Sequence, residues 1–247
     1  MKSKHVSNRT FDLNYFPEIC KLEKYVNRLP KFDKIKGRFE RRLSPKLQAK
    51  IGLMTENNVE LFEKSPSVID GSFERISFLA NSNSLGYFLR FPDQTSRWFD
   101  ENYLDNLNKF TVAVHVRRTD YLNLGHIYNV IDKNYYLDAI NSLRESNQKL
   151  SLHLFSDDPE GAMQWLGKEI KFQKVITQPL GTPNGEILRF MSTYKSIIGA
   201  NSTFSWWAAF LGKMTNKEIQ IVLPKKFSNL QNDFPEKYLK IDGAVFL

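Results

Sequence analysis

The stretch VAVHVRRTDYLN, residues Val112 to Asn123, decides the fold of this 247-residue chain. It begins with small and β-branched residues, which favour a buried strand, and it ends in two adjacent arginines followed by Thr119 and Asp120. Guanidinium groups that directly follow a buried strand would lie at its carboxyl end. Because a guanidinium group can bind two phosphate oxygens at once, the stretch predicts a strand that presents an anion site.

Strands and helices alternate from this stretch to near the end of the chain. Apolar patterns predict strands at 110–116, 150–155, 175–177, 196–200 and 219–223, and helices at 134–144, 186–194 and 202–211. Asp157, Asp158 and Pro159 predict the start of a further helix, because a polar cap and a proline are typical of a first turn. Repeated βα units of this kind predict an α/β fold, with a parallel sheet covered by helices on both faces.

The first hundred residues carry weaker patterns. Short runs suggest helices at 19–28, 46–54 and 87–104, and strand fragments at 59–63 and 67–71. We therefore expect two domains. The smaller and mostly helical one would cover residues 1–107, and a Rossmann-type domain would cover residues 108–247.

Positive charge is concentrated near the N-terminus. Residues 1–50 hold 14 Lys and Arg against 5 Asp and Glu, while the whole chain has a formal net charge of +8. A basic face can bind nucleic acid or an anionic membrane, and a solvated basic face is the plain alternative. No nucleic-acid-binding motif accompanies this charge. One cysteine, no bilayer-spanning apolar run and no signal-peptide pattern predict a cytoplasmic protein.

Three polar clusters follow predicted strands and should meet at one edge of the sheet. They are Arg117 to Asp120, Ser156 to Asp158, and Asn201 to Ser205. Arginines and a helix N-terminus attract phosphate, and a nearby carboxylate can accept hydrogen bonds from ribose or a base. Together the clusters predict a site for a nucleoside diphosphate beyond the carboxyl ends of the strands.

Each cluster also has a purely structural interpretation. The arginines could be surface charge, the aspartates and serines could cap helices, and His115 and His153 could be hydrogen-bonded core groups. Other enzyme classes lack their motifs in this sequence. No glycine-rich dinucleotide or Walker loop, no metal-ligand spacing and no Gly-x-Ser-x-Gly nucleophile occurs.

The motifs themselves resemble those of the α-1,2-fucosyltransferases. His115-Val116-Arg117-Arg118-Thr119-Asp120-Tyr121 resembles the family's His-x-Arg-Arg-x-Asp-Tyr motif, and Phe155 to Asp158 resembles its second motif. The stretch from Glu186 to Trp207 is similar to its third, and the order and spacing agree. The resemblance covers about residues 108 to 227.

The resemblance implies an inverting transferase that moves L-fucose from GDP-fucose to O2 of a terminal galactose without a metal. It implies a GT-B fold of two Rossmann-like domains. The donor would bind the domain at 108–247, and the domain at 1–107 would lie on the acceptor side. The acceptor would be a galactose-terminated glycan, in some enzymes lipid-linked, which would place the protein at the inner face of the membrane during surface glycan or O-antigen synthesis.

The resemblance also implies roles for particular residues. Arg117 would stabilise the β-phosphate of the leaving GDP, and Asp120 would be the base or would orient Arg117. The other expected donor-binding residues are His115, Arg118, Asp157, Asp158, Asn201, Ser202, Thr203 and Ser205.

One family feature is missing from the sequence. The glycine-rich Gly-Gly-Leu-Gly-Asn-Gln segment near the family's N-terminus is not found, so we expect a truncated acceptor-side domain. This leaves a second hypothesis, a remnant that binds GDP but turns over weakly or not at all. The third hypothesis, from another class, is a basic nucleic-acid-binding protein.

Overall fold

A computed structural model describes residues 16–17, 43–50, 53–54, 68–69, 89–103, 110–123, 125, 128–146, 149–229 and 239–247. The contacts along the chain divide it into two units. The first consists of residues 1–20 and 83–247, and the second consists of residues 21–82.

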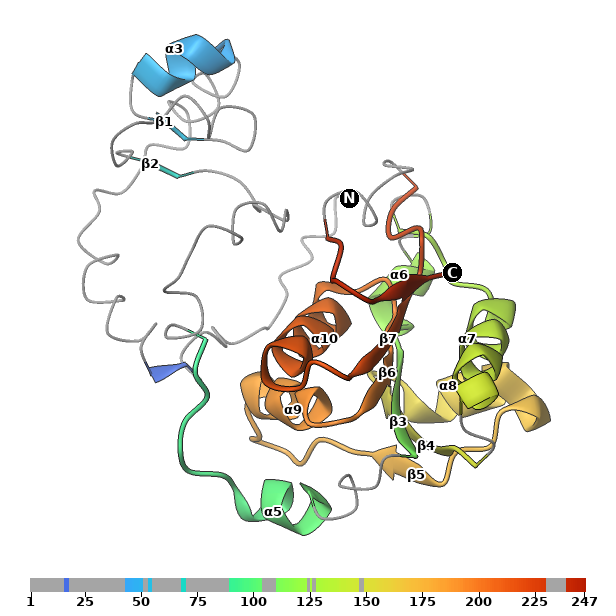
Figure 1. Cartoon of the computed structure of the whole chain (residues 1–247). Coiled ribbons are helices and arrows are strands. Elements are labelled where there is room, and N and C mark those ends of the chain that lie inside the picture. Colours follow the sequence, from blue (N-terminus) through green and yellow to red (C-terminus); the bar gives the residue numbers. More distant parts are fainter. Residues whose placement is uncertain are drawn as a thin grey trace. The chain divides into compact units, whose positions relative to one another are not determined.

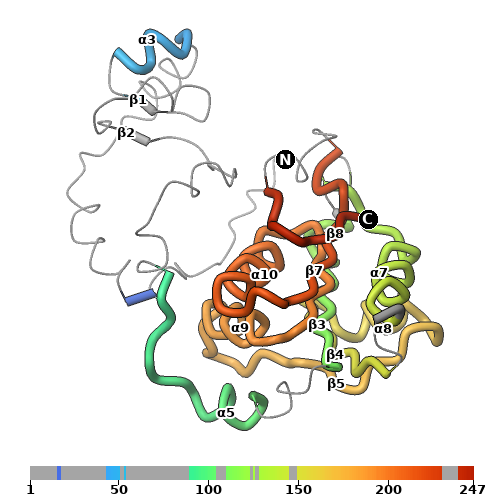
Figure 2. Tube along the Cα trace, viewed as in Figure 1, coloured from blue at the N-terminus to red at the C-terminus, as the bar shows by residue number. Residues whose placement is uncertain are grey.

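The first unit contains a parallel sheet of six strands in the order β5-β4-β3-β6-β7-β8 (Figure 2). The strands are β3 (Thr111–Val116), β4 (Ser151–Ser156), β5 (Lys174–Ile176), β6 (Ser196–Ile198), β7 (Gln220–Leu223) and β8 (Val245–Phe246). The expected α/β fold with a parallel sheet is therefore confirmed. The strand β8, which has only two residues, was not predicted.

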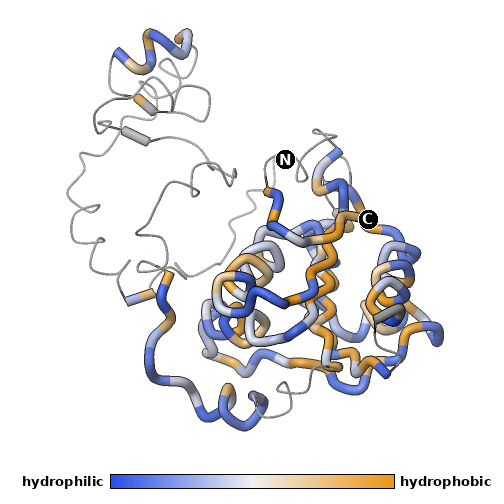
Figure 3. The backbone as a smooth tube through the Cα atoms, in the orientation of Figure 1, coloured by the Kyte–Doolittle hydropathy of each residue, from blue (hydrophilic) through white to orange (hydrophobic). Residues whose placement is uncertain are grey.

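Helices cover both faces of this sheet, as the sequence predicts (Figure 1). One face carries α7 (Lys133–Ser146) and α8 (Pro159–Leu166), and the other carries α9 (Asn184–Ser192) and α10 (Thr203–Thr215). Two further short elements are α6 (Thr119–Asn123), which follows β3 directly, and a 3-10 turn at Gly167–Glu169. Figure 3 shows the apolar residues gathered along the strands and the polar ones along the outer sides of the helices.

The central strand β3 is buried along its whole length, because helices lie on both sides of it. Val112, Val114 and Val116 point to the core under α7 and α8. The alternation of a strand sends Ala113 and His115 to the opposite face. Around the valines pack large side chains from both helices, among them Tyr136, Ala139, Ile140, Leu143, Ala162 and Leu166.

The core under α9 is aromatic. Phe190 and Tyr194 pack against Phe155 of β4, with ring centroids 6.1 Å and 5.5 Å from it. The Nδ1 atom of His153 lies 2.9 Å from the Tyr194 hydroxyl, and the imidazole is buried. His153 is therefore a hydrogen-bonded core group, which is one of the two interpretations that its sequence position allows.

Residues 89–103 run across α9 and belong to the same unit as the sheet. The segment includes α5 (Arg97–Tyr103), whose Phe99 packs edge-on against Phe190 at 5.5 Å. The buried carboxylate of Glu186 accepts a hydrogen bond from the Ser96 backbone at 3.0 Å. The Arg189 guanidinium donates to the carbonyls of residues 92 and 94, at 2.8 and 3.1 Å. The segment is thus fastened to α9 by both charge and packing.

In the second unit, α3 (Pro45–Lys50) is followed by β1 (Leu53–Met54), which pairs in parallel with β2 (Val68–Ile69). The helix expected at 46–54 thus ends at Lys50, because the next described residues pair as a strand. The strand fragment expected at 67–71 is present as β2. The expected helix at 19–28 and strand at 59–63 lie outside the described residues, and the domain boundary after residue 107 stays a prediction.

Candidate active site

The three polar clusters meet at one edge of the sheet. The strands β4, β3 and β6 are direct neighbours and run parallel, so their carboxyl ends lie together. Arg117 follows β3, Asp157 follows β4, and Asn201 lies in the loop after β6. The convergence that strand spacing predicted is therefore present in the structure.

Arg117 is held in place by two carboxylates. Its Nε and Nη2 atoms each donate to an oxygen of Asp120 at 2.9 Å, so the contact is bidentate. Its Nη1 atom lies 3.3 Å from a carboxylate oxygen of Asp157. Burial alone would lower the pKa of Arg117, but the hydrogen bonds to Asp120 and the charge of Asp157 raise that pKa above its ordinary value. Arg117 is therefore a fixed cation.

Asp157 links the ends of β3 and β4. Its carboxylate accepts hydrogen bonds from the backbone N–H groups of Arg118 at 2.9 Å and Thr119 at 3.2 Å, and from the Thr119 hydroxyl. These donors lie at the start of the short helix α6, where backbone N–H groups have no partner within the helix. Asp157 thus performs a capping role across the sheet, for a helix that lies about forty residues earlier in the chain.

Arg118 points away from Arg117, toward α8. Its guanidinium carbon lies 5.1 Å from the ring centre of Trp165, and its Nε atom lies 3.5 Å from an Asp158 oxygen. Asp158 also caps α8 by accepting a hydrogen bond from the Gly161 backbone at 3.0 Å. The two arginines thus have different surroundings, which their adjacency in sequence does not reveal.

His115 is buried one residue before the end of β3. Burial, together with the positive charge of Arg117, lowers its pKa from 6.5 to about 4, so the imidazole is neutral at pH 7. Its ring centre lies 5.5 Å from that of Phe204, in the first turn of α10. Its Nδ1 atom is buried and has no hydrogen-bond partner among the described residues. An unpaired buried nitrogen of this kind is costly, and it is expected where a ligand completes the hydrogen bond.

The hydroxyl residues at the start of α10 differ in exposure. Ser202 caps the helix by accepting a hydrogen bond from the Phe204 backbone at 3.3 Å, and Thr203 is exposed. Ser205 is fully buried, and its hydroxyl donates to backbone carbonyls of residues 200 and 202. Ser205 therefore shapes the loop from inside. Gly199 makes this packing possible, since a Cβ atom there would lie 2.5 Å from the Leu223 side chain.

The side chain of Asn201 is hydrogen-bonded to the loops around it. Its Nδ2 atom donates to the backbone carbonyls of Asn129 at 2.6 Å and Phe227 at 3.0 Å. The backbone carbonyl of Asn201 accepts a hydrogen bond from the Tyr121 hydroxyl at 3.0 Å. Tyr121 had no assigned role in the sequence, although its place in the His-x-Arg-Arg-x-Asp-Tyr motif was a signal that could have found it.

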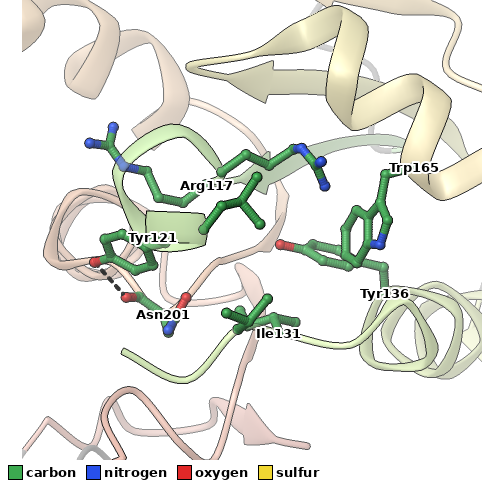
Figure 4. A pocket seen from close by; sticks show the side chains of 9 residues that line it. Arg117, Tyr121, Ile131, Tyr136, Trp165 and Asn201 are labelled. Atoms are coloured by element: carbon green, nitrogen blue, oxygen red, sulfur yellow. Dashed lines mark hydrogen bonds between the residues drawn. The ribbon is translucent and has the colours of Figure 1, made fainter. Parts of the chain in front are cut away.

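A pocket of about 100 Å³ lies beside the two arginines (Figure 4). Figure 4 shows Tyr121 and Asn201 joined by their hydrogen bond on one side of it, and Tyr136 with Trp165 on the other. The pocket is mostly apolar, and its lining consists of Arg117, Arg118, Tyr121, Leu122, Val130, Ile131, Tyr136, Trp165 and Asn201. Such a volume admits a small group but not a whole nucleotide.

The arginines do not give this edge an excess of positive charge. Two guanidinium groups are balanced here by the carboxylates of Asp120, Asp157 and Asp158. Lys225 and Lys226 follow the neighbouring strand β7, and within the described part of the chain neither makes an ion pair. These lysines were not among the predicted site residues. Among the described residues, no group of three or more His, Cys, Asp or Glu could hold a metal ion.

Comparisons with known proteins agree with the motifs. The model of glycosyl transferase family 11 matches residues 94–240. The Alpha-1,2-colitosyltransferase of Escherichia coli is 29% identical over 239 residues, which cover 88% of this chain and 73% of that protein. The O-antigen biosynthesis glycosyltransferase WbnK of Escherichia coli is 29% identical over 123 residues, which cover 49% of this chain and 40% of that protein.

A solved structure, the beta Kdo 2,7 transferase KpsC of Thermosulfurimonas dismutans, is similar over 86% of this chain and 85% of that one. The TM-score is 0.32 and the sequence identity is 13%. The family match covers more than half of this chain and includes all three polar clusters. The resemblance drawn from the motifs is thereby confirmed, and the chain belongs to glycosyl transferase family 11.

Proposed function

We propose that this chain is an inverting glycosyltransferase that moves L-fucose from GDP-fucose to O2 of a terminal galactose, forming an α-1,2 linkage. The observation that carries the proposal is the placement of Arg117 and the N-terminus of α10 after the adjacent parallel strands β3 and β6. A fixed guanidinium and a helix N-terminus at one sheet edge suit a diphosphate. The family membership supports a nucleotide-sugar donor and a glycan acceptor.

In this proposal, the diphosphate lies between Arg117 and the first turn of α10. Arg117 keeps one N–H group on each Nη atom for a ligand, because Asp120 occupies Nε and one N–H of Nη2 while Asp157 lies against Nη1. Thr203 is exposed at the helix start and can donate its hydroxyl. The unpaired Nδ1 of His115 would bond to the nucleotide. Ser205 and Asn201 would support these contacts from behind, since their donors are already used.

The reaction would be a single displacement. The galactose hydroxyl oxygen attacks the anomeric carbon of fucose, the bond from that carbon to the β-phosphate oxygen breaks, and GDP leaves with the electron pair. Arg117 would stabilise the charge that develops on the phosphate. A base must take the hydroxyl proton. Asp120 holds Arg117 with both oxygens, so we propose that it orients the arginine and is not that base.

We further propose a GT-B arrangement, in which residues 108–247 bind the donor and residues 1–107 contribute to acceptor binding. The parallel sheet supports the first half of this proposal. The acceptor would be a galactose-terminated glycan made for surface glycan or O-antigen synthesis, in keeping with the name of the relative WbnK, an O-antigen biosynthesis glycosyltransferase.

Thermal unfolding with and without GDP tests the donor site. Saturating GDP should raise the melting temperature, because a ligand that binds only the folded state stabilises it. No shift at millimolar GDP would remove the proposal. A shift together with no transfer from GDP-fucose to any terminal galactoside would leave the alternative, a protein that binds GDP but is a weak or inactive transferase.

A second donor is favoured by one observation. The relative that matches along most of this chain is named a colitosyltransferase, and colitose is fucose without the hydroxyl at C3. The two donors differ by one hydroxyl group, so the pocket contacts at that position would decide between them. Parallel assays with GDP-fucose and GDP-colitose at equal concentration distinguish the two. A clear preference for the colitose donor would replace fucose in the proposal.

Contact with a membrane surface is a separate part of the proposal. The basic residues of the first fifty could hold the protein to anionic lipid near a lipid-linked acceptor. In the described residues, no helix has the length and apolar character needed to cross a bilayer. Sedimentation with vesicles containing phosphatidylglycerol should carry the protein down at low salt. A variant with Arg41, Arg42 and Lys46 changed to Glu should remain in solution, and equal sedimentation of both would contradict the idea.

A further inference from the structure

We propose that Tyr121 is a positioning residue that sets the separation between Arg117 and the N-terminus of α10. The inference rests on the proposed function, because it assumes that a diphosphate lies between those two groups. It adds a residue whose contribution would act through others and would not require contact with the substrate.

Tyr121 contacts both sides of the candidate diphosphate site. The guanidinium carbon of Arg117 lies over the Tyr121 ring, 5.7 Å from its centre. The Tyr121 hydroxyl donates to the Asn201 carbonyl at 3.0 Å (Figure 4). Asn201 directly precedes Ser202, the cap of α10. One side chain therefore joins the arginine after β3 to the helix start after β6.

The Tyr121 ring is itself fixed by a second tyrosine. Tyr128 stacks on it with ring centres 4.2 Å apart and planes 3° from parallel. The backbone of Tyr128 is held in turn, since its carbonyl accepts from Asn229 at 3.2 Å and it forms a β-bridge with Ser228. A stacked and anchored ring has little freedom to change rotamer, so the hydroxyl is aimed in advance.

Asn201 is fixed by hydrogen bonds to two further loops. Its Nδ2 atom donates to the carbonyls of Asn129 and Phe227 at 2.6 and 3.0 Å. The Asn129 backbone also donates to the Phe227 carbonyl at 3.3 Å. The loops after β3, β6 and β7 are thus tied into one network. Tyr121 connects that network to the arginine, since its hydroxyl bonds to Asn201 and its ring lies under the Arg117 guanidinium.

The physical consequence concerns the β-phosphate in particular. An anion held by two groups is bound well only if both reach it at once, and a displacement of about 1 Å can cost up to a hundredfold in rate. The Tyr121 bond also engages a carbonyl oxygen next to the helix start, and that oxygen would otherwise repel an anion. Loss of the hydroxyl should therefore weaken the binding of the phosphate that contacts Arg117 more than the binding of the rest of the nucleotide.

The test compares GDP with GMP, which lacks the β-phosphate. Isothermal titration of the full chain gives both dissociation constants, and their ratio reports the β-phosphate contacts alone. Tyr121→Phe keeps the stacked ring and removes only the hydroxyl. We expect the variant to bind GDP about tenfold more weakly than the wild type does, with GMP affinity nearly unchanged, so that the preference for GDP over GMP falls about tenfold. Tyr103→Phe is the matched control. It removes a hydroxyl from α5 and should leave the ratio as in the wild type.

The possible results distinguish a failure of the inference about Tyr121 from a failure of the proposed function. If the wild type binds GDP more tightly than GMP and Tyr121→Phe keeps the same ratio, the inference is wrong and the proposed function stands. A lower melting temperature with an unchanged ratio would assign Tyr121 a purely structural role and also overturns the inference. If the wild type binds neither nucleotide, the proposed function fails and the inference fails with it.

Discussion

Arg117 and Asp120 are joined by two hydrogen bonds of 2.9 Å across the first turn of α6, and this pairing determines how the arginine can act. The bidentate contact occupies Nε and one N–H of Nη2, and Asp157 lies against Nη1, so one N–H on each Nη atom is left to face a ligand. Since the carboxylate is already committed, the geometry favours an orienting role for Asp120.

Asp120→Asn tests that role. An amide has an NH2 donor in place of the second carboxylate oxygen, so the bidentate contact with Arg117 is lost and the guanidinium should lose its fixed orientation. We predict that GDP affinity and turnover both fall about tenfold, in parallel. Titration calorimetry and an initial-rate assay measure the two quantities. Unchanged GDP affinity with abolished turnover would instead identify Asp120 as the base.

Arg117→Lys tests whether the geometry of the cation matters beyond its charge. A lysine keeps the positive charge but cannot form the two parallel bonds to Asp120 or present a planar edge to phosphate. We predict that GDP binding weakens by about 2 kcal/mol, the usual size of a lost charged hydrogen bond. The rise in melting temperature at a fixed GDP concentration measures this loss. A rise equal to that of the wild type would show that GDP binds at another site.

Buried His115 should make stability depend on pH. Its pKa is lowered from 6.5 to about 4 in the fold, so the unfolded chain binds more protons between those values. The stability that neutral His115 contributes is fully present above pH 6.5 and is lost as the pH falls toward 4. From pH 7.5 to pH 5, we predict a loss of about 2 kcal/mol in the free energy of unfolding. Urea titrations at both values measure the loss.

His115→Asn is the matched variant for that experiment, because an amide does not titrate. Between pH 7.5 and pH 5, the free energy of unfolding of this variant should fall by about 2 kcal/mol less than that of the wild type. Equal pH dependence in the two proteins would show that other groups are responsible.

Arg189 should stabilise the fold without affecting the site. It donates to two carbonyls of the segment 89–103, and its guanidinium lies 5.0 Å from the centre of the Phe99 ring. Arg189→Met keeps much of the packing and removes the charge, so we predict a loss of about 2 kcal/mol in the free energy of unfolding. Chemical denaturation measures it. The GDP dissociation constant should stay as in the wild type, and a large change in it would connect the segment to the donor site.

Strands and helices with strong local patterns were predictable to within a few residues. β3 and α7 match because their apolar periodicity is carried by their own sequence. β8, of two residues, and α6 were not predicted, and for α6 the physical reason is clear. α6 is five residues long, and its first N–H groups are capped by Asp157 from the end of β4. No local pattern encodes a cap that arrives from another strand.

By itself, the sequence determined that the arginines, the aspartates and the helix start would reach one sheet edge, because parallel βα units send every strand end to the same side. The pairing of Arg117 with Asp120, the position of Arg118 on Trp165 and the inward direction of Ser205 follow from the packing of the folded chain. Periodicity is a property of neighbouring residues. Which side chains meet depends on the packing of elements that are far apart along the chain.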